Sequence, residues 1–400
     1  KNKEMNENTI TSPYKTTTKT IIDENNNNAS MVDYLIFGTG AVSIMFGMIL
    51  HQNGKTIKFL GRDSKHSNER AEHWKKNGLI AQQTNSTDIV NFPAKISADT
   101  MKSLLLANED ESIPLIQNCK AIIVGVKRAG NEWVSKLLNK ANPSNDLPII
   151  MVQNGTNQSQ ELLNYCKQDD EKVDDISWNG TSIYNCMLAV AVNLREDNNC
   201  YISSDANVNL LALAKQSNPI VEVLCKTLSE AKFKTVMIDD IASSQRSKII
   251  LNCGNAVSAL FGYRMLDMWN DSNCRKLLNL SMSEGKQVFE KLNFTIDPKV
   301  NLMLKISGLP SFILCLLMPI LASKGGGREF VMSMNKDLVT EGKKTEVREL
   351  NGQIVQEGLE NNIPTPVNSA IVNVIEEMES GKRPRRALNK EEVKELFPFL

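Results

Sequence analysis

One lysine and two amides recur at helical spacing in the second half of the chain. Lys248, Asn252 and Asn255 lie at positions i, i+4 and i+7, so a helix would carry them on one face. Residues 249–251 between them are apolar, and asparagine is a poor helix former. A partly buried lysine can donate a proton to a carbonyl oxygen and attract a carboxylate. The stripe favours a substrate site, although an exposed lysine with two amides that bond backbone would share this spacing.

A second chemical pattern is a glycine turn between a short apolar strand and a helix. Residues 34–37 are typical of a buried strand, and a helix begins near Ala41. Gly38 would allow the tight turn, and Gly40 would let the backbone approach a phosphate. The free N–H groups of the helix N-terminus then face the negative charge. The pattern predicts that a dinucleotide's pyrophosphate binds at Gly38, Thr39, Gly40, Ala41, Val42 and Ser43.

The end of the next strand distinguishes between two cofactors. Residues 51–54 end the helix with a glycine, and residues 56–60 form a second strand that completes a β-α-β unit. An NAD site places an acid about 20 residues past the glycines, where it bonds the ribose hydroxyls. Here Arg62 follows the strand, and a guanidinium suits a 2′-phosphate. We therefore expect NADP(H). Asp63 argues against it, and Arg62 as a solvated loop charge is the alternative.

Histidine, the commonest proton donor for carbonyl reduction, is poorly placed in this chain. The three histidines are His51, His66 and His73, and all of them fall in the first nucleotide-binding unit. None lies in the later segments that would cover a nicotinamide ring. Lysine is the next candidate for the acid, and this favours Lys248.

These side chains need a scaffold, and the apolar runs indicate one. Buried strands are predicted at residues 119–126, 147–152, 186–192 and 234–238, with helices at residues 133–138 and 221–232. Beyond about residue 240 no strand is evident, and helices are expected at residues 244–261, 274–292, 346–361 and 367–377. The expected fold class is α/β. A Rossmann-type doubly wound sheet over residues 31–239 would be followed by an all-helical substrate and dimerisation domain over residues 240–400.

Composition narrows the partners and the compartment. Lys+Arg and Asp+Glu both number 46, so the formal net charge is zero and neither nucleic acid nor an acidic membrane is expected as the main partner. The eight cysteines are dispersed, without metal-ligand spacing. They indicate free thiols in a reducing compartment and no metal site. We therefore expect a cytoplasmic protein.

Two segments stand apart from the expected domains. Residues 1–30 are rich in Asn, Thr and Lys and nearly free of apolar side chains, so we expect a disordered tail. Residues 309–321 are apolar but interrupted by proline, and they are too short to span a bilayer. A core helix or the interface of a homodimer is the better interpretation.

Taken in order, these short motifs resemble the ketopantoate reductase (2-dehydropantoate 2-reductase) family. The resemblance covers roughly residues 32–380, and each piece alone is unspecific. The pieces that occur in family order are Gly38-Thr39-Gly40-Ala41-Val42, Gly61-Arg62, Val126-Lys127, Gln153-Asn154-Gly155, Lys248 with Asn252, Ser333 to Leu338, Thr345-Glu346-Val347, Leu350-Asn351-Gly352 and Ile363-Pro364-Thr365-Pro366.

The resemblance implies reduction of the C2 carbonyl of a 2-oxo acid by hydride from NADPH. It implies that Lys248 is the general acid and that Asn252 binds substrate oxygen atoms. Glu346 would anchor the product hydroxyl, support the lysine and lie at the cofactor. Ser333 would bind the substrate carboxylate. Two further residues would lie near the nicotinamide and the reacting centre, Lys127, which also contacts substrate, and Asn154.

Three departures from the family pattern bear on these expectations. Ala256 stands where a second substrate amide is common, and Asn255 could present an amide from nearly the same face. The spacing from Ser333 to Glu346 is one residue longer than usual. Ser43 replaces the last glycine of the phosphate loop. Nucleotide binding should survive the small serine, whereas the other two changes affect substrate choice.

Three functions remain open from the sequence. The first is ketopantoate reductase itself, in pantothenate and coenzyme A biosynthesis. The second is a relative that reduces another branched 2-oxo acid, which Ala256 and the altered serine spacing favour. The third is a sensor that binds NADP(H) without turnover. Lys248 argues against a sensor, which has no need of a lysine facing the nicotinamide. Lys127 as a surface charge and Glu346 as a first-turn helix acid also remain open.

Overall fold

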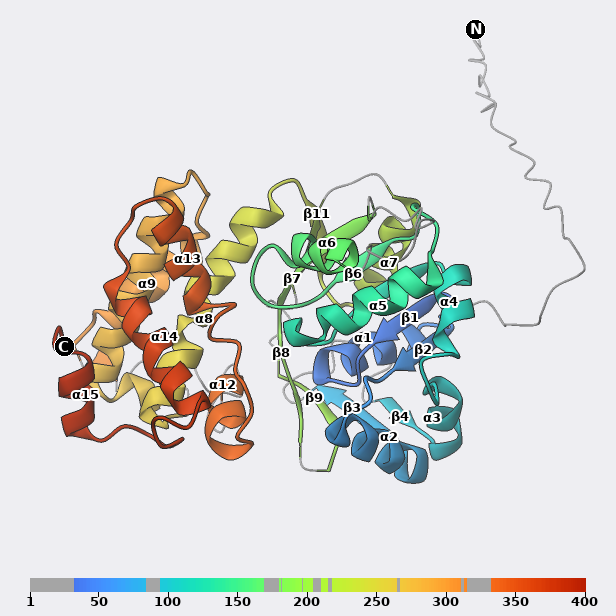
Figure 1. The fold of residues 1–400 in the computed structure, drawn as a ribbon, viewed down its shortest axis with the longest axis horizontal. Helices are drawn as coiled ribbons and strands as arrows, with labels where there is room; N and C mark the ends of the chain where they lie inside the picture. Colours follow the sequence, from blue (N-terminus) through green and yellow to red (C-terminus); the bar gives the residue numbers. More distant parts are fainter. Residues whose placement is uncertain are drawn as a thin grey trace, which may run out of the picture. The chain divides into compact units, whose positions relative to one another are not determined.

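An α/β region is followed by helices in the part of the chain that the structure describes (Figure 1). The computed structural model describes residues 32–83, 94–168, 180, 182–195, 197–203, 210–214, 218–264, 267–310, 313–314 and 332–400. The expected disordered tail, residues 1–30, lies outside the described residues, as does most of the apolar segment 309–321. Contacts group Met31–Leu400 as one compact unit.

The α/β region is organised by a seven-stranded sheet of order β11-β10-β7-β6-β5-β1-β2. Strands β2, β1, β5, β6 and β7 run parallel, β10 is antiparallel to β7, and β11 is parallel to β10. The strands are β1 (Tyr34–Phe37), β2 (Ile57–Leu60), β5 (Ala121–Val124), β6 (Ile149–Met151), β7 (Ile183–Ala189), β10 (Leu210–Ala214) and β11 (Thr235–Ile238).

Helices cover both faces of this sheet, as the continuous apolar strands predict. In β1, Tyr34 and Ile36 pack in one cluster with α1 and α7, while Leu35 and Phe37 pack in another with α4, α5 and α6. The doubly wound prediction is therefore confirmed. The helices are α1 (Ala41–Gln52), α2 (Lys65–Asn77), α3 (Ala98–Leu104), α4 (Ser112–Asn118), α5 (Asn131–Ala141), α6 (Gln158–Gln168) and α7 (Pro219–Glu230).

A second sheet of four strands was not predicted. Its order is β4-β3-β9-β8, with β3 (Leu79–Gln83), β4 (Ala94–Ile96), β8 (Ala191–Leu194) and β9 (Cys200–Ser203). The single strand predicted at residues 186–192 is wrong, because β7 ends at Ala189 in the large sheet and β8 begins at Ala191 in the small one. The other strands of this sheet are short and mix polar with apolar residues, so periodicity gives a weak signal.

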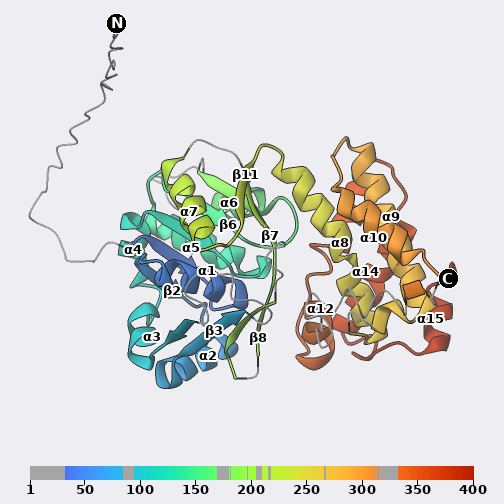
Figure 2. The same ribbon diagram turned by 180° about the vertical axis from the view of Figure 1, so that it is seen from behind.

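The described residues of the C-terminal region form helices and connecting loops, and no strand lies among them. Its core helix α8 packs against α9, α13 and α14 (Figure 2). The predicted helix 346–361 is wrong at its start, because α13 begins at Asn351 and Glu346 precedes it. The elements are α8 (Ile241–Phe261), α9 (Ser272–Lys291), α10 (Pro298–Ser307), α12 (Ser333–Asn335), a π-helical turn η5 (Lys336–Thr340), α13 (Asn351–Glu360), α14 (Pro366–Glu379) and α15 (Lys390–Leu396).

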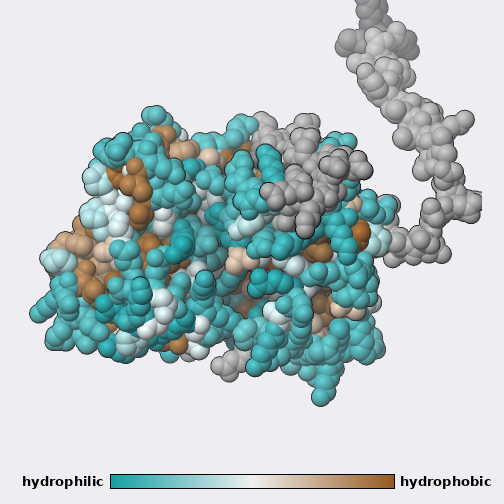
Figure 3. All heavy atoms as spheres, viewed as in Figure 1, coloured by the Kyte–Doolittle hydropathy of each residue, from teal (hydrophilic) through white to brown (hydrophobic). Residues whose placement is uncertain are grey.

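The surface gives no sign of a large apolar patch on the face seen in Figure 3, where hydrophilic residues surround smaller hydrophobic patches. Large hydrophobic side chains are exposed at only four described positions, Val223, Leu302, Val339 and Leu359. No helix of the described residues has both the length and the apolar character that crossing a membrane requires.

Candidate active site

The glycine turn after β1 has the geometry that the sequence predicts. Gly38 has φ +110°, and a Cβ there would lie 2.9 Å from Ser43 Oγ, so only glycine fits. A Cβ on Gly40 would meet only the carbonyl oxygen of Gly125, at an ordinary contact distance of 3.9 Å. Gly40 is the N-cap of α1 and no side chain caps this helix. Its N-terminal N–H groups are therefore available for an anion.

Ser43 stands where the third glycine of the motif is usual, and Gly47 follows one helical turn later. Both positions lie where α1 packs against the sheet. A Cβ on Gly47 would lie 2.1 Å from the Phe59 ring, so this glycine allows α1 to pack closely on β2. Ser43 is completely buried, and its Oγ donates to the carbonyl of Phe37 at 3.4 Å. Gly125 makes room for it, because a Cβ there would lie 2.3 Å from Ser43 Oγ. The serine is thus accommodated without disturbing the turn.

Basic side chains lie next to this turn, at the end of β2 and on α2. Arg62 is exposed and its Nη1 donates to the carbonyl of Ala129 at 3.3 Å. The neighbouring acid, Asp63, accepts a bond from Asn68 Nδ2 at 2.8 Å and so contacts the first turns of α2. Arg70, which no sequence pattern indicated, donates from Nη1 to the carbonyl of Thr39 at 2.9 Å. The sequence carries no signal for this contact, because nothing in it indicates that Thr39 faces α2.

The predicted acid, Lys248, lies in α8 and meets residues from two distant segments. Its Nζ donates to Asn154 Oδ1 at 2.6 Å, and Asn154 Nδ2 donates to Glu346 Oε2 at 3.1 Å. Asn154 follows β6, at the carboxyl end of a parallel strand, where ligands of doubly wound sheets bind. The structure therefore joins Lys248, Asn154 and Glu346 in one hydrogen-bonded chain.

Two of these three residues, Lys248 and Asn154, border a small cavity. The cavity has a volume of about 10 Å³, which is the room that one water molecule needs. Asn252 lies on the same face of α8 as Lys248 and also borders the cavity. The residues that line it are Gln153, Asn154, Gly155, Cys186, Met187, Gln245, Lys248, Ile249 and Asn252.

Burial lowers the pKa of Lys248 to about 8. The ammonium loses hydration among the surrounding protein atoms, and the negative charge of Glu346 opposes this effect only in part. A lysine with this pKa is still mostly protonated at neutral pH, and it gives up its proton far more readily than an exposed lysine. The group therefore has the properties of a general acid.

Three predicted substrate residues do not border this cavity, namely Asn255, Ser333 and Lys127. Asn255 is half-buried, but it is absent from the cavity lining. Ala256 is fully buried in the core of the helical region. Ser333 is exposed at the start of α12 and does not border the cavity either. Of the two asparagines in the predicted stripe, only Asn252 borders the cavity with Lys248.

Lys127 links the end of β5 to the helical region. Its Nζ bonds Asp337 Oδ2 of η5 at 2.8 Å, and the aspartate is the better buried partner. Burial alone would lower the pKa of Lys127, but the carboxylates of Asp337 and Glu346 outweigh it and raise the pKa. Lys336 of the same turn donates to the carbonyl of Leu194 at 3.2 Å. Lys127 is thus a firmly charged group beside Glu346.

A second acid near Glu346 was also missed from the sequence. Burial, with the charge of Glu346 as a further cause, raises the pKa of Glu349. The backbone of Glu349 lies against Gly155, because a Cβ on that glycine would be 3.0 Å from the carbonyl oxygen. Arg128, which donates to Glu161 and to the carbonyl of Thr156, lies 3.0 Å from the same point. This acid borders the turn that carries Asn154.

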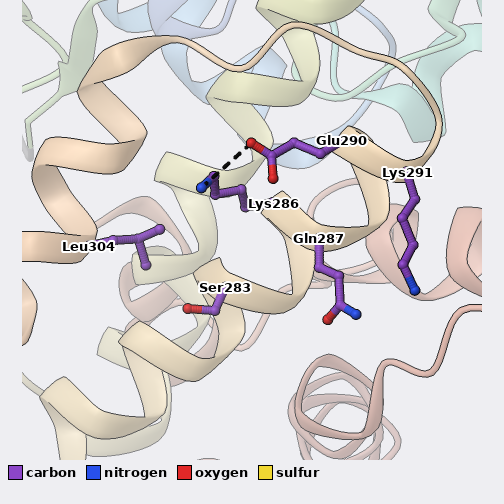
Figure 4. Close-up of a pocket in the computed structure, with 6 residues that line it drawn as sticks. All are labelled: Ser283, Lys286, Gln287, Glu290, Lys291 and Leu304. Carbon is purple, nitrogen blue, oxygen red and sulfur yellow. Dashed lines mark ion pairs between the residues drawn. The ribbon is translucent and has the colours of Figure 1, made fainter.

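A wider hollow than this cavity lies elsewhere. It has a volume of about 460 Å³ and is open to solvent along α9 and α10. Figure 4 shows Lys286 and Glu290 paired along one helix at its rim, 3.5 Å apart. None of the predicted site residues lines it. Among the described residues, no group of His, Cys, Asp and Glu side chains is arranged to hold a metal ion.

Comparison with known proteins identifies the family of this chain. Residues 34–213 match the model of the family described as Ketopantoate reductase PanE/ApbA, and residues 240–379 match that of its C-terminal domain. The chain is 20% identical over 347 residues to a 2-dehydropantoate 2-reductase of Archaeoglobus fulgidus, which covers 86% of this chain and 97% of the relative.

Two solved structures illustrate the shared fold. D-mandelate dehydrogenase in a ternary structure with NADH and anilino(oxo)acetate has a TM-score of 0.64 and 17% identity, covering 87% of this chain and 98% of the other. A dimeric ketopantoate reductase from Staphylococcus aureus has a TM-score of 0.59 and 16% identity, covering 88% and 99%. The chain therefore belongs to the ketopantoate reductase PanE/ApbA family of NAD(P)-dependent oxidoreductases.

Proposed function

We propose that this protein reduces 2-dehydropantoate (ketopantoate) to (R)-pantoate with NADPH, in pantothenate and coenzyme A biosynthesis. The observation that carries the proposal is the hydrogen-bonded chain of Lys248, Asn154 and Glu346 beside a cavity at the end of β6. It supports an acid next to the place where a nicotinamide ring and a carbonyl would meet. The family supplies the reaction class, and the substrate name rests on the sequence resemblance.

The glycine turn and its surroundings fit an NADP(H) molecule. Gly40 presents no side chain toward a phosphate, and Arg62 is exposed at the end of β2. Asp63, which would argue for NAD, is engaged with Asn68 instead. NADPH, when bound, supplies the hydride. The residues proposed to hold it are Gly38, Thr39, Gly40, Ala41, Val42, Ser43, Arg62, Lys127, Asn154 and Glu346.

The protein groups then act on the substrate oxygen. Lys248 donates a proton to the C2 oxygen as the carbonyl is reduced, and Asn154 holds the ammonium in position. The carboxylate of Glu346 balances the positive charge of Lys248 and accepts a hydrogen bond from the product hydroxyl. Asn252 bonds a substrate oxygen, and Lys127 attracts the carboxylate. Because the cavity has room for only about one water, these groups must separate for a 2-oxo acid to enter.

A second candidate is the reduction of another 2-oxo acid. Ala256 is buried and has no amide, and Ser333 is exposed and does not line the cavity. Neither position therefore offers a polar group to a substrate in the cavity. Ser333 and Asn255 stay predictions from the sequence. The fold shared with D-mandelate dehydrogenase makes a bulkier 2-oxo acid a reasonable alternative. A sensor without turnover is the least favoured of the three.

The test is NADPH oxidation by the purified protein, followed by ultraviolet absorbance. Ketopantoate, 2-oxoisovalerate, phenylglyoxylate and pyruvate are compared, with NADH as the control cofactor. Preference for ketopantoate with NADPH is the expected result. Preference for another 2-oxo acid would show that the proposed substrate is wrong and that the proposed mechanism can stand. Tight NADPH binding without turnover of any acid would refute the reductase and leave a sensor.

Three further expectations belong to the same proposal. We divide the chain into a nucleotide-binding domain, residues 31–239, and a helical substrate domain, residues 240–400, in line with the two family models. A homodimer is proposed on the example of the Staphylococcus aureus relative. A cytoplasmic location is proposed from the cysteine pattern, and none of the seven cysteines within the described residues forms a disulfide.

A further inference from the structure

Two buried glutamines connect α8 to the turn that carries Asn154. Gln245 lies one helical turn before Lys248 and is 4% exposed. Its Nε2 donates to Gln158 Oε1 at 3.0 Å, and Gln158 is completely buried in the first turn of α6. The bond joins the α/β region to the helical region through two neutral amides, and neither amide belongs to the catalytic groups proposed above.

Gln158 also holds the backbone on both sides of Asn154. Its Nε2 donates to the carbonyl of Gln153 at 3.1 Å and to the carbonyl of Gly155 at 2.7 Å. The two carbonyls flank the residue that accepts the bond from Lys248. A single amide thus fixes the turn with its nitrogen and receives α8 with its oxygen.

We propose that Gln245 and Gln158 are positioning residues that hold Lys248 in register with Asn154. The inference rests on the proposed function, because it gives these glutamines a role in proton transfer. A lysine side chain has four rotatable bonds, so its bond to Asn154 cannot by itself fix α8 relative to the turn. Both glutamines are buried, so a lost bond leaves an unpaired amide that water does not readily satisfy.

The first test is Gln245→Met, which keeps length and burial and removes the amide. A shift of the acid by about 1 Å can lower turnover by about 100-fold, so we expect kcat to fall by between about 10-fold and 100-fold. NADPH affinity should stay within about twofold, because no cofactor residue changes. Gln160→Ala is the matched control, since Gln160 is exposed on α6 and bonds only Asn164.

A second variant separates the two bonds of the bridge. Gln158→Glu keeps an oxygen for Gln245 but loses both donations to the Asn154 turn, so the same loss of kcat is expected. The double variant of both positions should be no worse than the poorer single variant, because the two residues act as one unit. Normal kcat in both single variants, or losses that simply add, would overturn the proposal.

The pH dependence distinguishes positioning from bulk stability. If the bond between Gln245 and Gln158 no longer holds α8 against the turn, water reaches Lys248 and its pKa rises. In Gln245→Met, the fall of kcat at high pH should therefore occur at a higher pH than in the wild type. A lower melting temperature with an unchanged pH profile would assign the glutamines a structural role only.

A readout without turnover keeps this inference separate from the proposed function. The rate at which trinitrobenzenesulfonate labels Lys248 is measured against pH by peptide mass spectrometry, in the wild type, Gln245→Met and Gln160→Ala. A midpoint that rises only in Gln245→Met supports the bridge, even if no 2-oxo acid is reduced. An unchanged midpoint refutes it, whatever the activity of the wild type.

Discussion

The glycine turn and the Lys248 cavity are assembled in different ways. The turn is local: Gly38 and Gly40 lie between β1 and α1, and Gly47 lies in α1. The close contacts that a Cβ would make require glycine at Gly38 and Gly47. The cavity joins segments that are far apart, since Lys248 lies 94 residues from Asn154 and Glu346 lies 192 residues from it. A local site survives as long as its backbone is kept, whereas an assembled site depends on how two regions pack. Variants in each part should therefore fail in different ways.

The largest effect is expected from Lys248→Ala. General acid catalysis contributes between about 100-fold and 10,000-fold, so kcat should fall by that range while NADPH affinity stays nearly constant. Steady-state kinetics and NADPH fluorescence titration measure the two quantities. Lys286→Ala, a change of an α9 lysine paired with Glu290, is the control and should have no effect on either. Loss of NADPH binding together with activity would contradict the proposal that the glycine turn and the Lys248 cavity act independently.

Gly47→Ala should break the local site through stability. The new Cβ would lie 2.1 Å from the Phe59 ring, and overpacking of this kind costs between about 1 and 3 kcal/mol. Urea unfolding measures the free energy change. Gly40→Ala is the contrast, because its Cβ would make only an ordinary 3.9 Å contact with the carbonyl oxygen of Gly125 and its φ is −82°. That variant should keep its stability within about 0.5 kcal/mol and bind NADPH more weakly. Equal stability loss in both would contradict the comparison.

Arg62→Ala tests the cofactor end by changing one ligand group. A hydrogen bond to a charged group is worth between about 1.5 and 3 kcal/mol, so the dissociation constant for NADPH should rise by between about 10-fold and 100-fold. The constant for NADH, which lacks the 2′-phosphate, should not change. Arg348→Ala, at an exposed arginine paired with Glu376, serves as the control. A parallel loss for NADPH and NADH would assign Arg62 to another part of the cofactor.

The smallest effect is a shift of the pH profile. Lys248 must be protonated to act as the acid, so kcat should fall as the pH rises through about 8. Glu346 raises the pKa of this lysine, and removing its charge in Glu346→Gln should therefore move the fall to lower pH. Rate profiles of both proteins, measured at saturating NADPH, give the two midpoints. A midpoint that moves to higher pH would mean that hydration, and not the carboxylate, dominates the change.

The same contrast explains what could be predicted from the sequence. The glycine turn, the parallel strands and α8 follow from short-range patterns, and the structure confirms them. The bridge of Gln245 and Gln158 gives no such pattern, because a glutamine in a helix looks the same whether it is exposed or buried. Arg70 and Glu349 were missed for the same reason. The second sheet was missed because β4 has only three residues and pairs with a strand of mixed polarity.

The arrangement of α8 has a consequence for how such proteins diversify. Asn252 borders the cavity, while Ala256, one turn further along the same face, is packed in the helical core, so the cavity and the core follow each other along one face of α8. Mutations at the cavity end of this face need not be compensated in the core. The cofactor turn, held by glycines in another region, is left untouched by such drift. A lineage built on this helix can therefore acquire a new substrate in a few steps while it inherits its redox partner unchanged.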